Sequence, residues 1–138
     1  MSYAISEALQ EAIFTRLAAD PALTAEVGSH IYDALPAGPI PGLYVSLGPE
    51  KVRAASDASA DGAWHDISVI VVTDAGGFRQ AKRAAVALSD ALEGADLTLA
   101  RGRLTSLRFL RAEARHRSGG LRRIEMIFRA RVDDDQSQ

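Results

Sequence analysis

One strand-like segment constrains the fold of this chain more than any other. Residues 66–73 read DISVIVVT, in which β-branched residues follow one another almost without interruption. A strand with one solvent-exposed face shows apolar residues at every second position, whereas a strand buried on both faces is apolar nearly throughout. We therefore expect residues 66–73 to form a central strand of a sheet.

The N-terminal segment is expected to form an amphipathic helix over residues 6–19. Its apolar stripe consists of Ile5, Leu9, Ala12, Ile13 and Leu17. Asp20-Pro21 ends this helix, because the residue before a proline disfavours the helical conformation. Pro21 can then open a short second helix that runs to Glu26 and is closed by Gly28.

Another main helix should follow the central strand. Its apolar stripe consists of Phe78, Ala81, Ala85, Leu88 and Leu92. We expect Thr73-Asp74 to cap its start and Gly94 to end it. The DAGGF segment between strand and helix lacks the glycine spacing and lysine of a phosphate loop, so helix capping is the better interpretation.

The segments before the central strand are less regular. Residues 31–42, IYDALPAGPIPG, contain three prolines and two glycines and predict an irregular connection. LYVSLG at 43–48 alternates like a strand. Residues 50–63, EKVRAASDASADGA, are small, polar and aperiodic, so we expect a long exposed loop. The only tryptophan, Trp64, should anchor the adjoining strand in the core or at a hinge.

The C-terminal part predicts a β-hairpin. After an extended piece, a long strand runs to residue 117 with a bulge between Leu107 and Leu110; SGG at 118–120 turns the chain, and a second strand returns. One side of the returning strand is apolar: Ile124, Met126, Phe128 and Ala130. The other side carries Arg123, Glu125, Arg129 and Arg131, and in the first strand Arg111, Glu113, Arg115 and Arg117 share one parity.

The element order α-(α)-β-β-α-β-β predicts an α+β fold, a mostly antiparallel sheet with two main helices packed on one face. We expect one domain over residues 1–132 and an acidic disordered tail at 133–138. The chain has no cysteine, no apolar run near the ~18 residues of a membrane helix and no basic segment at its N-terminus. A cytoplasmic place of folding is the expectation.

Charge is distributed unevenly along the chain. The net charge is −2, but residues 1–100 carry −7, residues 101–131 carry +8, and residues 132–138 carry −3. Such a chain should fold with faces of opposite sign, which suits head-to-tail contacts between copies or docking on other partners.

Signatures of catalysis are missing. The sequence has no P-loop, no G-x-S-x-G and no HExxH motif, so we expect no enzyme, no cofactor and no metal site. The histidines, His30, His65 and His116, lie in separate segments and are expected at the surface or at sheet edges. Spacing gives no reason to pair the carboxylates of Asp33, Asp57, Asp61, Asp74 and Asp90, which are expected to cap helices or to be solvated in loops.

The strongest anomaly is the arginine hairpin, residues 107–131, which holds eight arginines and two glutamates. A solvated sheet face is the simplest interpretation, but two glutamates cannot neutralise eight arginines. The excess positive charge therefore favours an acidic partner outside the chain. Nucleic acid fits the charge, but only Phe109 and Phe128 interleave with the arginines. An acidic protein surface, including that of a neighbouring copy, fits equally well. The candidate interface residues are Lys51, Arg53, Asp57, Asp61, Arg108, Arg111, Arg115, Arg117, Arg122, Arg123, Arg129 and Arg131.

The order of the segments and their amino-acid sequences resemble those of the small tail-completion proteins, or tail terminators, of long-tailed phages. The segments are AWHDISVIVVTDAGG, AKRAAVALSDAL, ADLTLARGRL and LRRIEMIFRARV, preceded by IYDALP and LYVSLGPE. The likeness covers nearly the whole chain and is strongest to the tail terminators of gene transfer agents, phage-like particles that package host DNA.

This resemblance implies an α+β structural protein that forms a homohexameric ring and caps the tail tube at its head-proximal end. The ring would stop tube polymerisation and join the tube protein to the head-side connector or stopper, first in the cytoplasm and then in the particle. Residues 50–63 and the arginine hairpin are our candidates for its contacts. DNA would pass through without specific binding, so most hairpin arginines should face protein. A neck protein on the head side, or a nucleic-acid-binding protein, are the alternatives.

Overall fold

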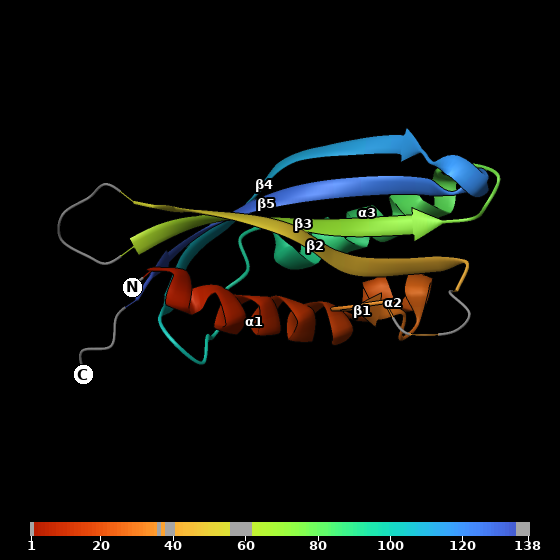
Figure 1. The fold of residues 1–138 in the computed structure, drawn as a ribbon. Coiled ribbons are helices and arrows are strands. Elements are labelled where there is room, and N and C mark those ends of the chain that lie inside the picture. Colours follow the sequence, from red (N-terminus) through yellow and green to blue (C-terminus); the bar gives the residue numbers. More distant parts are fainter. Residues whose placement is uncertain (1, 36, 38–40, 56–61, 135–138) are drawn as a thin grey trace.

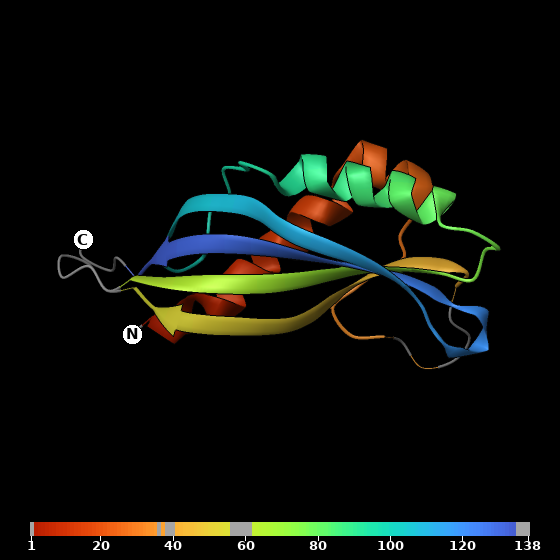
Figure 2. The ribbon, with the colours of Figure 1, turned by 90° about the horizontal axis from the view of Figure 1, so that it is seen from above.

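The computed structural model describes residues 2–35, 37, 41–55 and 62–134. A five-stranded sheet with the order β1-β2-β3-β5-β4 carries its helices on one side (Figures 1 and 2). Along the chain the elements are η1 (Ser2–Ile5), α1 (Ser6–Ala18), α2 (Pro21–Val27), β1 (Ile31–Tyr32), β2 (Leu43–Ala54), β3 (Gly62–Thr73), α3 (Arg79–Leu92), β4 (Arg103–His116), η2 (Ser118–Gly120) and β5 (Arg122–Asp133). The predicted α+β class with a C-terminal hairpin is confirmed.

The central strand lies where the sequence places it. β3 pairs antiparallel with β2 on one side and with β5 on the other, and residues 67–73 are all buried. Pairing on both sides satisfies the backbone hydrogen-bonding groups of β3, while its β-branched side chains fill both faces.

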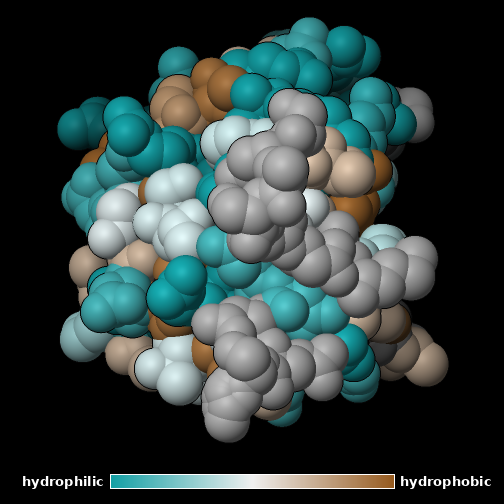
Figure 3. All heavy atoms as spheres, turned by 90° about the vertical axis from the view of Figure 1, so that its left-hand side faces the viewer, coloured by the Kyte–Doolittle hydropathy of each residue, from teal (hydrophilic) through white to brown (hydrophobic). Residues whose placement is uncertain are grey.

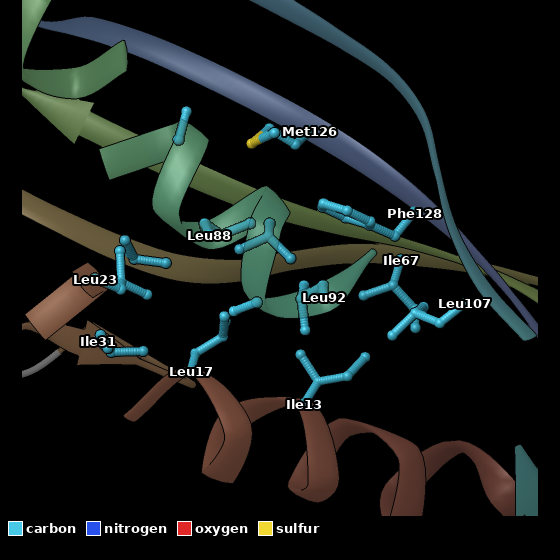
Figure 4. Packing of buried hydrophobic residues seen from close by; sticks show 14 of the residues in the cluster. Ile13, Leu17, Leu23, Ile31, Ile67, Leu88, Leu92, Leu107, Met126 and Phe128 are labelled. Atoms are coloured by element: carbon cyan, nitrogen blue, oxygen red, sulfur yellow. The ribbon is translucent and has the colours of Figure 1, made fainter. Parts of the chain in front are cut away.

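The hydrophobic core lies between the sheet and the helices. Figure 4 shows Ile13 and Leu17 of α1 pointing toward Leu92 of α3, with Ile67 and Phe128 contributed by the strands. The large side chains in this layer are almost fully buried, including Phe128 at 0% exposure. The predicted apolar side of β5 is confirmed, since Ile124, Met126, Phe128 and Ala130 are all buried.

Two helix predictions differ in their outcome. α2 begins as expected, with Pro21 in its first turn and the Asp20 carboxylate accepting a hydrogen bond from the Leu23 amide at 2.9 Å. The prediction that Thr73-Asp74 caps α3 is wrong, because that helix starts at Arg79 without a side-chain cap. The Thr73 hydroxyl instead accepts a hydrogen bond from the Ala75 amide at 3.1 Å and stabilises the turn that leaves β3.

The prediction of a loop over residues 50–63 is wrong at both ends. β2 continues to Ala54 and β3 begins at Gly62, while residues 56–61 lie outside the described chain. A register shift between Leu47 and Glu50 interrupts the alternation that would identify the strand from sequence. Beyond it, pairing with β3 holds a polar segment in the sheet, because ladder hydrogen bonds do not depend on side-chain hydrophobicity.

Three smaller features can also be compared with expectation. Within the segment predicted as irregular, residues 31–32 form the short strand β1, which pairs parallel with β2. The predicted bulge in β4 is confirmed by a register shift between Phe109 and Arg111, and a second, unpredicted shift lies between Leu104 and Ser106. β5 extends into the predicted acidic tail through Asp133, and Arg101 binds Asp134 at 2.9 Å; residues 135–138 are outside the described chain.

Candidate functional site

The face of the sheet opposite the helices, called the open face here, carries polar and charged side chains together with a small buried apolar cluster of Tyr44, Ile70 and Val72. Register places Trp64 of β3 beside Arg131, Asp66 beside Arg129, and Val72 beside Arg123. The predicted second parity of β5 is therefore confirmed. In Figure 3, which views the molecule from the left-hand end of Figure 1, the surface outside the grey atoms is mostly hydrophilic with scattered apolar residues.

The arginine hairpin brings like charges opposite one another. Register pairs Arg108 with Arg129, Glu113 with Glu125, and Arg115 with Arg123. Directly opposed like charges destabilise a strand pair. Partial compensation runs along each strand, through ion pairs of Arg115 with Glu113 at 2.9 Å and of Arg123 with Glu125 at 3.8 Å. The hairpin therefore keeps a banded surface with excess positive charge.

Some predicted interface arginines have partners within the chain. The Arg129 guanidinium binds both carboxylate oxygens of Asp66, at 2.8 and 3.0 Å. This hydrogen bonding lowers the pKa of Asp66, although burial opposes the shift. Arg122 donates to the Ala75 carbonyl oxygen at 2.8 Å and lies over the Phe78 ring, so it anchors the turn between β3 and α3.

Trp64 is neither a core nor a hinge residue. It is half-buried on the open face, where Arg53 and Arg131 lie over its ring at 5.6 and 5.4 Å from the centroid. Two cations over the indole use the surface on which a nucleic-acid base would stack. This geometry favours a structural role for Trp64 over a base-stacking one.

Other predicted candidates are exposed on the strands near the edges of the sheet. Arg111, Arg115 and Arg117 are exposed on or just after β4, the outermost strand, and Lys51 and Arg53 are exposed on β2. Arg108 contacts Glu93 at 3.7 Å. Asp57 and Asp61 lie outside the described residues. The structure thus places exposed cations on β4, of which Arg108 and Arg115 have acidic partners, and half-buried, internally paired arginines on β5.

An acidic groove lies along α1. Its volume is about 690 Å³, and its lining includes the carboxylates of Glu7, Glu11 and Asp33. Tyr3, at the same groove, is 58% exposed although it is large and partly apolar. The Gln10 side chain donates a hydrogen bond to Asp33 and so links α1 to the segment that follows β1. We call this feature the α1 groove.

An apolar groove of about 400 Å³ lies between α3 and the hairpin. Its lining includes Val86 of α3, Phe109 of β4 and Met126 of β5, with Lys82 and Glu113 as its charged members. Val86 and Phe109 are 60% and 43% exposed, and Phe109 meets Phe128 edge-on at 5.8 Å. We call this feature the α3–β4 groove.

Neither groove was identified from the sequence. Glu7 and Glu11 are four residues apart and therefore share a helix face away from the apolar stripe, a signal that could have marked the α1 groove. Val86 is an apolar residue outside the apolar stripe of α3. It marks the α3–β4 groove only once Phe109 is known to line the other side of that groove.

His65 is buried, contrary to the prediction of a surface or edge position. It has 0% exposure, and its Nδ1 lies 2.8 Å from Glu50 Oε2, while the Ser6 hydroxyl donates to Glu50 Oε1 at 2.7 Å. Burial alone would raise the pKa of Glu50, but the hydrogen bonds from His65 and Ser6 outweigh it and lower that pKa. Since a carboxylate only accepts, His65 carries its proton on Nδ1.

This cluster ties three elements together and contains no activated nucleophile. Ser6 and His65 both bind the Glu50 carboxylate rather than each other, whereas nucleophilic catalysis needs the hydroxyl against its base. The Ser6–Glu50–His65 cluster therefore joins the start of α1 to β2 and β3, and its role is structural.

The remaining chemistry-bearing residues are dispersed. His30 bonds the Tyr32 hydroxyl at 2.9 Å, and His116 packs edge-on against Phe78. Across the described ranges, no three histidine, aspartate or glutamate side chains gather as a metal site. No helix among the described residues is long and apolar enough to cross a membrane.

Comparison with known proteins identifies relatives over the whole domain. The model of the family described as "Tail completion protein gp17" matches residues 11–133. A chain in the solved structure "Virion of native gene transfer agent (GTA) particle" is 56% identical, with a TM-score of 0.91, and the match covers 96% of this chain and 99% of that one. No curated protein matches.

Proposed function

We propose that this chain, which belongs to the tail completion protein gp17 family, completes the tail of a gene transfer agent particle as a hexameric ring. The ring caps the tail tube at its head-proximal end, stops tube polymerisation and joins the tail to the head-side connector. Proteins of the family are structural and not enzymes, in agreement with the prediction from sequence.

One observation carries the proposal: the 56% identity to a chain of a gene transfer agent virion, extending over nearly the full length of both chains. At this similarity and coverage, the two chains share a fold. The organisation of the described residues is compatible with this conclusion, because exposed grooves and charged edges are their distinctive features.

Deletion of the gene from cells that make the particle provides the test. We expect detached tails, or tubes of uncontrolled length, and a large loss of DNA transfer; re-expression of the wild-type chain should restore both. Electron microscopy measures tail length and attachment. Tails of normal length that remain joined to heads in the deletion strain would overturn the proposal.

The position of the protein separates a tail terminator from a neck protein. An antibody or tag on the chain should mark the end of purified tails before they meet heads. If the label appears on tailless heads and is missing from free tails, the protein belongs to the head side of the joint.

In the proposed ring, DNA would pass through the central channel, and this limits where the hairpin arginines can face. A lumen lined densely with arginine would hold phosphates rather than let DNA pass. We therefore expect most hairpin arginines to contact protein in the particle. DNA binding by the isolated chain should be weak, independent of sequence and lost at physiological salt. Tight binding with a steep salt dependence would favour the nucleic-acid alternative.

A further inference from the structure

We propose that the α1 groove and the α3–β4 groove are the two halves of one head-to-tail contact between copies of this chain. The α3–β4 groove of one copy receives the acidic, tyrosine-bearing surface of α1 from the next copy. The inference rests on the proposed ring and assigns the surfaces that hold it together.

The two grooves lie at opposite edges of the sheet. Strand order places β1 and β2 at one edge and β4 at the other. The α1 groove includes Asp33, which follows β1 directly, while the α3–β4 groove is built on β4 itself. Figures 1 and 2 show α1 and the distal end of the β4–β5 hairpin well separated in both views. Unlike surfaces at opposite edges make a heterologous contact, and a heterologous contact closes into a ring when its rotation permits.

The surfaces are complementary in charge. The α1 groove has the carboxylates of Glu7, Glu11 and Asp33. The α3–β4 groove has the ammonium of Lys82, and exposed Arg111 and Arg115 lie on the same edge strand, on the open face beyond the groove. Its one acid, Glu113, is held by Arg115 at 2.9 Å, so it does not stand as an uncompensated negative charge. Opposite potentials of this kind favour the head-to-tail register and disfavour like-to-like pairing of two identical grooves.

Each surface also has an apolar centre. Val86 and Phe109 expose 60% and 43% of their surface in one groove, and Tyr3 exposes 58% in the other, beside half-buried Phe14. An apolar centre with a charged rim is the organisation of protein–protein interfaces, and tyrosine is enriched in them because it pairs a large apolar ring with a polar tip. Neither surface needs a different protein to explain it.

β4 favours contact through side chains rather than strand addition. It is the outermost strand, and near its middle Glu93 accepts a hydrogen bond from the Phe109 amide at 2.5 Å while the Leu107 carbonyl accepts one from the Gly94 amide at 2.8 Å. Further along, exposed arginines line this edge. Covered backbone groups and long charged side chains both oppose edge-to-edge pairing, which leaves the groove beside the strand as the docking surface.

Reciprocal charge reversal tests the contact in particle-producing cells. The acidic variant pair is Glu7→Lys with Glu11→Lys, and the basic pair is Lys82→Glu with Arg115→Glu. Each pair alone should lower the yield of tailed particles at least about tenfold, equivalent to about 1.4 kcal/mol at one contact. All four substitutions together should restore most of the yield. A matched control, Asp74→Lys with Asp90→Lys, adds the same charge outside both grooves and should have little effect.

The outcomes separate the contact from the proposed function. If deletion of the chain abolishes tail completion but both variant pairs behave like wild type, the ring stands and this contact is wrong. If the pairs impair assembly and the fourfold variant is no better than either, the contact is also wrong. If deletion itself has no effect on tails, the proposed function fails.

Cross-linking provides a second measurement that does not depend on charge. The chain has no cysteine, so Tyr3→Cys with Val86→Cys introduces the only thiols. A short bismaleimide added to purified particles should give a ladder of covalent multiples of this chain. Either single variant should give none, because a head-to-tail contact never places two copies of one residue together. Dimers formed equally by a single variant would overturn the assignment.

Discussion

The two faces of β5 differ in burial and in the contacts they make, although they are formed by alternating residues of one strand. Toward the helices, Phe128 and Ala130 are fully buried at 0% exposure. On the open face, Arg129 and Arg131 bind Asp66 and Asp133 and remain partly accessible. The covered face supplies most of the hydrophobic free energy of folding, so the open face and the sheet edges are free to carry charge, which in the proposed ring would serve contacts with partners.

The largest effect on the free energy of unfolding should come from removing a buried side chain from the covered face. Phe128→Ala removes a fully buried aromatic side chain and should lower the free energy of unfolding by about 3–5 kcal/mol. The neighbouring Ile127→Ala, on the open face, should cost only about 1 kcal/mol, because its side chain is half-buried. Denaturant titration of the two variants measures the contrast. Equal losses would show that both faces contribute alike to the core.

The Ser6–Glu50–His65 cluster should rank second. Glu50→Gln weakens two hydrogen bonds to a partly buried carboxylate and should cost about 1–3 kcal/mol at neutral pH. Glu7→Gln, which changes an exposed carboxylate on α1, is the control and should leave the free energy of unfolding unchanged. A loss no larger than that of the control would mean that the cluster is not a stabilising link.

The pH dependence of this variant follows from the pKa of Glu50, which lies below its ordinary value of 4.5 in the folded chain. A depressed carboxyl pKa stabilises the fold above the unfolded pKa, and that stabilisation is lost as pH falls through the folded pKa. The difference between wild type and Glu50→Gln should therefore shrink as pH falls below 4.5. A difference that grows as pH falls below 4.5 would contradict this assignment.

The same contrast explains what could be predicted from sequence. The covered face was predictable, because β3 is apolar throughout and β5 alternates with period two. The distal half of β2 was not, because its local composition is polar and a register shift hides its alternation. His65 was missed because only the fold brings Glu50 and Ser6 to it.

The candidate surfaces divide in a similar way. The excess charge of the hairpin was visible in the sequence, since it needs only a count. The internal partners of Arg122 and Arg129 were not, because they depend on residues 47 and 63 positions away. Both grooves depend on which helix lies beside which strand, and local patterns do not contain that information.

The Asp66–Arg129 pair on the open face should have a smaller effect than Glu50. Asp66→Asn removes one charge from a partly exposed pair, and such pairs contribute little because water and salt screen them. Its loss of stability should be below that of Glu50→Gln and should diminish at high salt. Because hydrogen bonding from Arg129 lowers the pKa of Asp66, the contribution should disappear as pH falls below its ordinary value of 3.8. A loss that persists at high salt would mean the pair acts as a buried one.

The smallest effect on folding should accompany a large effect on assembly. Arg115→Glu with Arg117→Glu changes exposed side chains at the end of β4, so the free energy of unfolding should stay within about 0.5 kcal/mol per substitution. Reversal at Arg115 also places the new carboxylate beside Glu113, and this repulsion puts the expected loss of stability at the upper end of that range. Tail completion should nevertheless fall sharply, because the surface that faces a partner has changed sign. Thermal unfolding of the purified variant and counts of tailed particles measure the two effects separately. If stability collapses while the assembly of the folded fraction is normal, these arginines serve the fold, and the division between a covered face that folds the chain and edges that assemble it is wrong.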